Sequence, residues 1–299
     1  EVVDSRQPAT GPAYPTLKSR LDASDVRLRD LAYNVKSFGA KGDGSDDSAA
    51  VVQAITAAAG APVYFPKGTY DVSAMTAVAG KVNLVSLGDA VIKGFKYTEL
   101  NAPPQDVTAT VSNNDAFFTA SDITFEGSDT YYGLRLENQS QSSFIRSFNI
   151  FNCTFRGALG LATKNCIDAI IQGCSFIHNQ VGWNALSCTN IAVTDCNFYS
   201  PLGYGVLIDT ANNDAYNRKG GENIKFSNCM WSDGVTAIHC LNHNYLWLVN
   251  CTIDYFNMGI YMIGSRYARI TQSYIGYTAL DRSAQTGYIA PVKTGCIYA

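Results

Sequence analysis

Three carboxyl groups, two cations and a tyrosine lie within one polar stretch of the chain, DTANNDAYNRKGGE (Asp209–Glu222). Two carboxyl groups at a fixed separation can share the acid and base, or acid and nucleophile, roles of glycoside hydrolysis. A cation can hold a charged substrate, and an aromatic ring can pack against a sugar. The residues with these capacities are Asp209, Asp214, Glu222, Tyr216, Arg218 and Lys219. The simpler alternative is a solvated surface loop.

A repeat of cysteines indicates which elements position this stretch. Their spacings are 21, 22, 33 and 22 residues, at Cys153, Cys174, Cys196, Cys229 and Cys251. A fixed period near 22 residues is typical of a solenoid, in which each coil contacts only its neighbours. The 33-residue interval exceeds 22 by 11 residues, and the excess is the polar stretch that follows Asp209. The stretch is therefore an insertion between two coils.

Each repeat carries a strand pattern, with apolar residues two positions apart. Two residues after the cysteine comes an inward aromatic or aliphatic position: Phe155, Phe176, Phe198, Trp231 and Ile253. The residue before the cysteine is Asn, Gly or Asp, which tolerate a left-handed backbone, so the chain turns there. A third short strand follows. The sequence predicts an all-β fold, a single right-handed parallel β-helix with three short strands per coil of about 22 residues. A helical repeat fits poorly, since β-branched and aromatic residues dominate.

Aligning the coils places several side chains in outward columns of the third strand. Asn184, His239 and Tyr261 share one column, and Asp209 lies in the next. We expect these side chains, together with Tyr204, to surround a ligand at the root of the insertion. Trp183 falls in an inward column and is expected in the core.

The expected catalytic pair combines an acid on a strand with an acid in the insertion. Carboxyl groups stand about 5–5.5 Å apart for retention and about 6.5–9.5 Å apart for inversion, and neighbouring coils are about 4.8 Å apart. No outward column supplies acids on adjacent coils, so Asp209 would pair with Asp214 or Glu222. The rival acidic patch is Asp233 with Asp254, past the second strand. Asp195 is excluded because its column is the turn.

Composition narrows the classes of partner. The net charge is −3 and the pI about 5.6, so nucleic acid is not an expected partner. No apolar run is long enough to span or insert into a membrane. Nine cysteines occur without a CxxC pair, alongside three scattered histidines, so we expect neither a metal nor another cofactor. The column cysteines are expected to face inward as small hydrophobes, and an odd number of reduced thiols suits assembly in a cytoplasm.

The chain divides into three expected parts. Residues 1–33 form a linker and a helical neck, since Leu17, Leu21, Ser24, Leu28 and Leu31 follow a heptad spacing. The neck would hold identical chains together; the alternative is a helix packed on the domain. Residues 34–60 form a capping segment with a helix that begins near Asp47 or Ser48 and ends before Gly60. Residues 61–299 form the β-helix, with truncation at its C-terminal end as an open alternative.

The capping segment and the first coil resemble the start of the pectate lyase-like superfamily, as found in bacteriophage tailspikes and capsule depolymerases. The matching residues are Val35, Phe38, Gly39, Ala40, Gly42, Asp43, Gly44, Asp46, Asp47, Val63, Phe65, Pro66, Gly68 and Tyr70. The resemblance implies a homotrimer, joined to the virion tail or baseplate through its N-terminus and made in the host cytoplasm. It also implies binding, and often cleavage, of a bacterial surface polysaccharide such as a capsule or O-antigen. The motif itself names no catalytic residue.

Three functions follow from this resemblance. The expected one is an endo-glycosidase that hydrolyses the polysaccharide through Asp209 and Asp214, with Arg218 or His239 holding substrate charge. A polysaccharide lyase is an alternative, in which Arg218 or Lys219 takes a proton beside a uronate carboxylate. A non-catalytic attachment fibre, or a fragment of one, is the other alternative.

Overall fold

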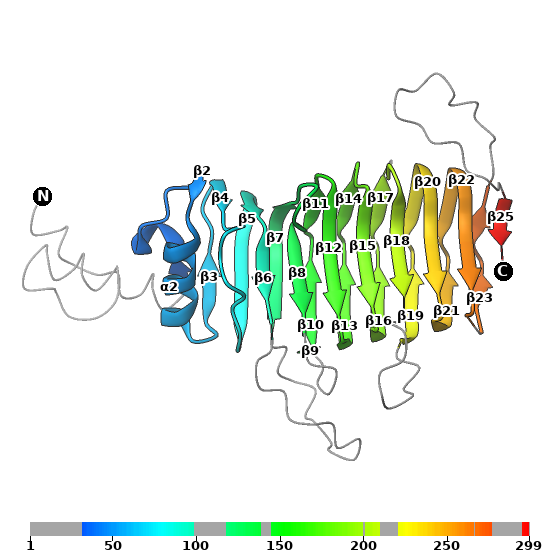
Figure 1. Ribbon diagram of the computed structural model, residues 1–299, viewed down its shortest axis with the longest axis horizontal. Helices are drawn as coiled ribbons and strands as arrows, with labels where there is room; N and C mark the ends of the chain where they lie inside the picture. Colours follow the sequence, from blue (N-terminus) through cyan, green and yellow to red (C-terminus); the bar gives the residue numbers. More distant parts are fainter. Residues whose placement is uncertain are drawn as a thin grey trace, which may run out of the picture.

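The computed structural model describes residues 32–98, 118–138, 145–199, 201–209, 221–265, 267–276 and 295–298. These residues form one parallel β-helix, and Figure 1 shows its coils stacked along a single axis. Helix α2 (Ser48–Ala58) lies at the N-terminal end and strand β25 (Gly295–Tyr298) at the other. The predicted fold class is confirmed. The predicted neck, up to Leu31, lies outside the described residues.

Each coil contributes strands to three faces, and neighbouring strands pair in parallel throughout the described residues. The first-strand face consists of β1 (Tyr33–Asn34), β3 (Pro62–Tyr64), the first part of β5 (Val82–Lys93), the first part of β7 (Phe118–Glu126), β9 (Ile145–Arg146), β10 (Phe148–Phe151), β13 (Cys166–Gln172), β16 (Thr189–Thr194), β19 (Glu222–Ser227), β21 (Asn244–Val249) and β23 (Arg269–Thr271).

The second-strand face consists of β2 (Asp43–Asp46), β4 (Gly68–Asp71), the later parts of β5 and β7, β11 (Thr154–Arg156), β14 (Ser175–Ile177), β17 (Asn197–Tyr199), the first parts of β20 (Met230–Leu241) and β22 (Thr252–Ile263), and β24 (Tyr274–Ile275). The third-strand face consists of β6 (Phe95–Tyr97), β8 (Leu134–Glu137), β12 (Leu159–Lys164), β15 (Val181–Leu186), β18 (Tyr204–Asp209), the later parts of β20 and β22, and β25. Three separate strands per coil are therefore not universal, because β5, β7, β20 and β22 each continue around a corner as one strand.

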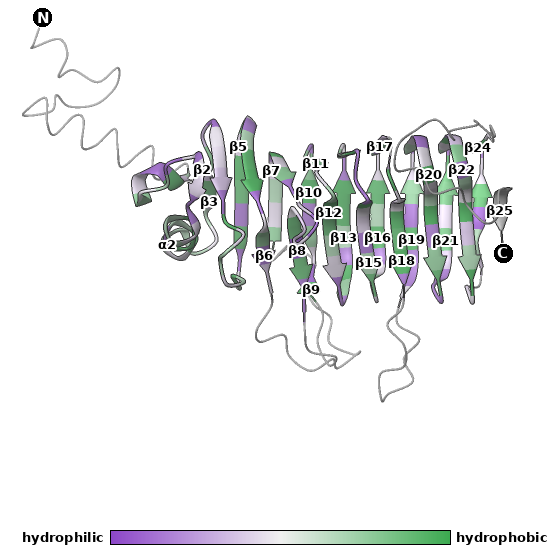
Figure 2. Cartoon of the chain, turned by 45° about the horizontal axis from the view of Figure 1, so that its top comes forward, coloured by the Kyte–Doolittle hydropathy of each residue, from purple (hydrophilic) through white to green (hydrophobic). Residues whose placement is uncertain are grey.

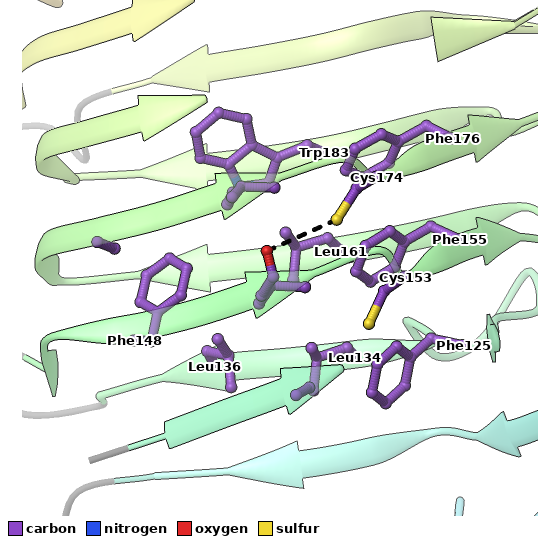
Figure 3. Close-up of a cluster of buried hydrophobic side chains, with 14 of the residues drawn as sticks. Phe125, Leu134, Leu136, Phe148, Cys153, Phe155, Leu161, Cys174, Phe176 and Trp183 are labelled. Carbon is purple, nitrogen blue, oxygen red and sulfur yellow. Dashed lines mark hydrogen bonds between the residues drawn. The ribbon is translucent and has the colours of Figure 1, made fainter. Parts of the chain in front are cut away.

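An aromatic stack fills the interior behind the second strands. Phe155 and Phe176 stack with ring centroids 4.7 Å apart, and Phe176 and Phe198 with centroids 4.5 Å apart. Trp231 continues the stack 4.9 Å beyond Phe198. Figure 3 shows the Phe155 and Phe176 rings of this stack beside Cys153 and Cys174, and Figure 2 shows apolar and polar residues alternating along the strands. Neighbouring coils therefore repeat the same side chain at the same inward position, which aligns them in register.

The cysteine column also lies inside. All eight described cysteines are buried and free of disulfides. Burial raises the pKa of the Cys153 thiol to about 12, so it stays protonated. The register continues as predicted through Ser273, whose Oγ accepts the Cys251 backbone N–H at 3.0 Å.

The corner before this column is left-handed, as its residue types predicted. The residues at this corner have φ values between 51° and 65°. They are Asn152, Gly173, Asp195, Asn228, Asn250 and Gln272. Three of these side chains form a ladder, in which Asn250 donates to Asn228 at 2.9 Å and Asn228 donates to Asp195 at 3.2 Å. Asp195 is therefore committed to the turn.

The motif that carried the family resemblance builds the N-terminal end of the stack. The Asp47 carboxylate is buried and accepts the backbone N–H groups of Lys41 at 2.7 Å and Gly42 at 2.9 Å. Helix α2 packs against β1, β3 and the short helix η2 (Val35–Phe38), and Gly60 follows its left-handed C-cap. These residues are structural, since they cover the first coil with an apolar helix face.

Candidate functional site

The third-strand face carries one continuous outward column, in the predicted register. Its members are Lys96, Arg135, Ala162, Asn184, Leu207, His239 and Tyr261. The parallel coils hold these positions at the spacing of neighbouring strands, about 4.8 Å. The face is formed by β8, β12, β15 and β18, which lie side by side in Figure 1. Side chains from different coils therefore meet on one surface.

Tyr132 joins this column from outside its strand. Its hydroxyl accepts a hydrogen bond from Asn184 Nδ2 at 3.0 Å. Ala162, which lies in the column on the coil before Asn184, is only 1% exposed. Tyr132 could not be predicted from the column pattern, because it precedes β8 and belongs to no outward column. The adjacent tyrosines in TYYG (130–133) were the available signal.

His239 lies between two tyrosines. Its ring centroid is 5.0 Å from that of Tyr204 and 4.8 Å from that of Tyr261. Neither imidazole nitrogen has a hydrogen-bond partner among the described residues. Burial lowers the pKa of His239, and the negative charge of Asp209 partly opposes that shift. The side chain is thus a neutral imidazole whose two buried nitrogens retain unused hydrogen-bonding capacity beside the aromatic rings.

Asp209 is the last residue of β18 and is half-buried beside this cluster. Its backbone oxygen accepts the Ser187 N–H at 2.9 Å, which fixes the strand end. Three predicted site residues, Asp214, Tyr216 and Arg218, lie outside the described residues, as does Lys219. The structure therefore places Asp209 near His239, which itself lies between Tyr204 and Tyr261, but it does not describe the insertion.

Glu222 opens β19 at the far end of the insertion. It is exposed and pairs in register with Thr189 and Asn244 on the first-strand face. Glu222 thus lies on the first-strand face and Asp209 on the third-strand face, so a catalytic pair formed by these two residues would join carboxyl groups from two faces of the β-helix.

The rival acidic patch lies at another corner. Asp233 occupies a left-handed turn with φ 58°, in the same corner column as His178 and Tyr255. Asp254 lies in the neighbouring column, opposite Ser232, and its Oδ1 accepts the backbone N–H of Tyr255 at 3.0 Å. The two acids thus belong to different columns, and one of them shapes a turn, much as Asp195 does.

The described residues contain no group of three His, Cys, Asp or Glu side chains that could hold a metal ion. Within the same residues, no helix combines the length and apolar character needed to cross a membrane. The site described above consists of amides, aromatic rings, an imidazole and a carboxylate, which suits a polar ligand.

Comparison with known proteins identifies a protein family that matches most of the chain. Residues 32–279 match the family model described as rhamnogalacturonase A/epimerase, pectate lyase-like. Mannuronan C5-epimerase AlgE2 of Azotobacter vinelandii is 38% identical over 114 residues, which cover 32% of this chain and 11% of that protein. The pre-neck appendage protein of Bacillus phage phi29 is 27% identical over 235 residues, which cover 75% of this chain and 23% of that protein. The chain thus spans under a quarter of each of these relatives.

Solved structures share the fold. The A-module of mannuronan C-5 epimerase AlgE6 from Azotobacter vinelandii superposes with a TM-score of 0.56 at 23% identity, over 81% of this chain and 76% of that one. The surface adhesin PfbA of Streptococcus pneumoniae gives a TM-score of 0.52 at 19% identity, over 81% of this chain and 61% of that one. At these identities the likeness concerns the fold alone.

Proposed function

The chain belongs to the rhamnogalacturonase A/epimerase family of pectate lyase-like proteins, and on that premise we propose that it binds and depolymerises a bacterial surface polysaccharide, a capsule or an O-antigen, as part of a phage appendage. The observation that carries the proposal is the polar and aromatic column on the third-strand face. The similarity to a phage pre-neck appendage protein over 75% of the chain supports the setting. A homotrimer joined to the virion tail or baseplate, and made in the host cytoplasm, completes the proposal.

The column suits an extended saccharide. From Asn184 to Tyr261 it crosses three coil steps, or about 14 Å at the usual strand spacing. Tyr204 and Tyr261 offer aromatic rings, while Asn184 offers planar hydrogen-bonding groups to hydroxyls. A polymer lying along the axis would contact several coils at once, so that cleavage within the chain, rather than at its ends, is the expected mode.

Hydrolysis needs one carboxylic acid to protonate the leaving glycosidic oxygen and one carboxylate to activate water or to attack the anomeric carbon. Asp209 supplies one of these groups from the neighbouring column, on the same coil as Leu207. The second comes from the insertion that begins directly after Asp209, with Asp214 or Glu222 as candidates. Arg218 and Tyr216 in the same insertion would hold the substrate.

A lyase reaction is the second candidate, and His239 favours it. Its imidazole is neutral, and its two buried nitrogens have no hydrogen-bond partner among the described residues, so a nitrogen that the bound substrate reaches is able to accept a proton. In an elimination the base takes the proton beside a uronate carboxylate, the electron pair forms a carbon–carbon double bond, and the glycosidic oxygen leaves. The relative named as a C5-epimerase suggests proton transfer at the same kind of carbon, since epimerisation removes and returns a proton.

One experiment separates these reactions. The protein is incubated with a panel of capsular and O-antigen polysaccharides, and the products are analysed by mass and ultraviolet absorbance. Hydrolysis yields oligosaccharides that have gained one water per cut, whereas elimination yields an absorbing unsaturated end. A protein that binds a polysaccharide and releases no oligosaccharide would be an attachment fibre, and hydrolysis and elimination would both be rejected.

A further inference from the structure

A second column of residues with left-handed backbone conformation lies where the first strands bend, and its residue types change along the molecule. In the middle coils it holds Asp168, Asn190 and Asn223, with φ values of 58°, 56° and 60°. Their side chains form a hydrogen-bonded ladder: Asn190 donates to Asp168 at 3.1 Å, and Asn223 donates to Asn190 at 3.0 Å. Asn and Asp suit this conformation, because their short polar side chains bond locally.

In the next two coils the same column holds Tyr245 and Tyr267, with φ values of 58° and 61°. A bulky residue in this region is uncommon and costs free energy relative to Asn. The two rings stack at 4.9 Å with planes 11° apart, and Tyr267 remains 65% exposed. The fold itself therefore does not require these rings, and their exposure points to recognition of something outside the chain.

The neighbouring outward column supplies cations. It runs from Lys225 through Trp247 to Arg269, in register on β19, β21 and β23. The Arg269 guanidinium lies 5.6 Å from the centre of the Trp247 ring. Figure 2 shows β16, β19 and β21 side by side on this face. Strands β21 and β23 contain no Asp or Glu, and no ion pair of Lys225 or Arg269 occurs among the described residues.

We propose that Tyr245, Trp247, Tyr267 and Arg269, here called the first-strand patch, form a second binding surface for acidic saccharide units. Aromatic rings and indole suit the apolar faces of sugars, and a guanidinium pairs with a carboxylate or sulfate through two parallel hydrogen bonds. Lys225, one coil away, extends the positive charge.

This inference rests on the proposed polysaccharide target but concerns another face of the molecule. The first-strand patch lies on β21 and β23, whereas His239, Tyr204 and Tyr261 lie on the third strands. The patch would hold one segment of the polymer while the third-strand column holds the segment that is cut. An anchored polymer stays near the cutting site between events, which raises its effective concentration there.

The tryptophan emission that iodide quenches reports on the patch. The chain contains three tryptophans, of which Trp183 and Trp231 are 0% exposed and Trp247 is partly exposed. We would titrate the Asp209→Asn protein with short polyuronate oligosaccharides and follow Trp247 emission and its quenching by iodide. Dextran oligosaccharides of equal length serve as the neutral control. The expected result is a saturable change with the polyuronate, protection of Trp247 from iodide, and no change with dextran.

The matched variant is Tyr245→Asn combined with Tyr267→Asn, which extends the existing Asn ladder. It should keep or raise the melting temperature, and it should weaken polyuronate binding at least about tenfold through loss of both rings. Arg269→Gln should weaken binding and reduce its dependence on ionic strength. Unchanged affinity in the double variant would overturn the proposal. A loss of the oligomer in that variant would also overturn it, because the rings would then be a contact between copies of the chain.

Failure here and failure of the proposed function are distinguishable. If polyuronates leave Trp247 emission unchanged while oligosaccharide products are still released from a polysaccharide, the first-strand patch is rejected and the third-strand site stands. If polyuronates bind at Trp247 while no polysaccharide in the panel is cut, the patch stands and depolymerisation is rejected.

Discussion

The imidazole of His239 meets the ring of Tyr261 edge-on, with centroids 4.8 Å apart and ring planes 72° apart. The two residues come from adjacent coils and are 22 positions apart in the chain. Stacking successive coils thus converts a sequence period into a contact between two side chains of the candidate site. Because the contact lies on the outer surface, the site can change without altering the core.

Replacing Tyr261 tests the binding role of this column. Tyr261→Leu should weaken polysaccharide binding about tenfold, because the ring that packs on the sugar is lost while the outward position tolerates leucine. Binding is measured by calorimetry with long oligosaccharides. Tyr199→Leu is the matched control, since Tyr199 is 50% exposed on the second-strand face. Equal affinities of both variants would remove Tyr261 from the site.

Replacing Asp209 should also change the titration of His239. Burial lowers the pKa of His239, and the Asp209 charge partly restores it. Asp209→Asn removes the restoring charge, so the pKa of His239 should fall further. A proton NMR titration of the histidine ring signals measures this shift. A rise, or no change, would show that the two groups do not interact.

The fold and the column registers could be predicted from the sequence, because a solenoid repeats its residue types at a fixed period. Asn152 and Asn228 indicated left-handed corners by residue type alone. Tyr132 could not be placed, because it reaches Asn184 from a corner with no repeat. Tyr245 and Tyr267 do lie in a repeated column, but they stand where other coils have Asn or Asp. Because tyrosine does not indicate a left-handed residue, the bend at these two positions could not be predicted from residue type. The insertion carries no repeat, and its part in the site stays a prediction.

Buried His243 should make stability depend on pH. Burial lowers the pKa of this histidine to about 4, from an unfolded value near 6.5. In the folded state the His243 imidazole is neutral, so its stabilisation is complete above pH 6.5. This stabilisation is lost as the pH falls toward 4, because the unfolded chain protonates this histidine at a higher pH than the folded chain does. The loss amounts to about 3 kcal/mol.

Denaturant unfolding between pH 7 and 4 measures this loss. The His243→Gln variant should show a shallower decline than the parent protein, and the exposed-corner variant His178→Asn should decline as the parent does. Parallel curves for parent and His243→Gln would contradict the assignment.

The cysteine columns should resist modification. All eight described thiols are buried, so iodoacetamide should leave them unmodified in the native protein and alkylate them after denaturation. Mass spectrometry of tryptic peptides gives the count per site. Rapid native alkylation of Cys174 or Cys196 would contradict the closed interior.

Polysaccharide cleavage by the parent protein and by Asp209→Asn tests the account most directly. Both proteins are incubated with the polysaccharide that the parent binds, and oligosaccharide release is followed by mass spectrometry alongside thermal unfolding. We predict oligosaccharides from the parent, none from Asp209→Asn, and the same melting temperature for both. Undiminished cleavage by Asp209→Asn would contradict a reaction centred on the third-strand column.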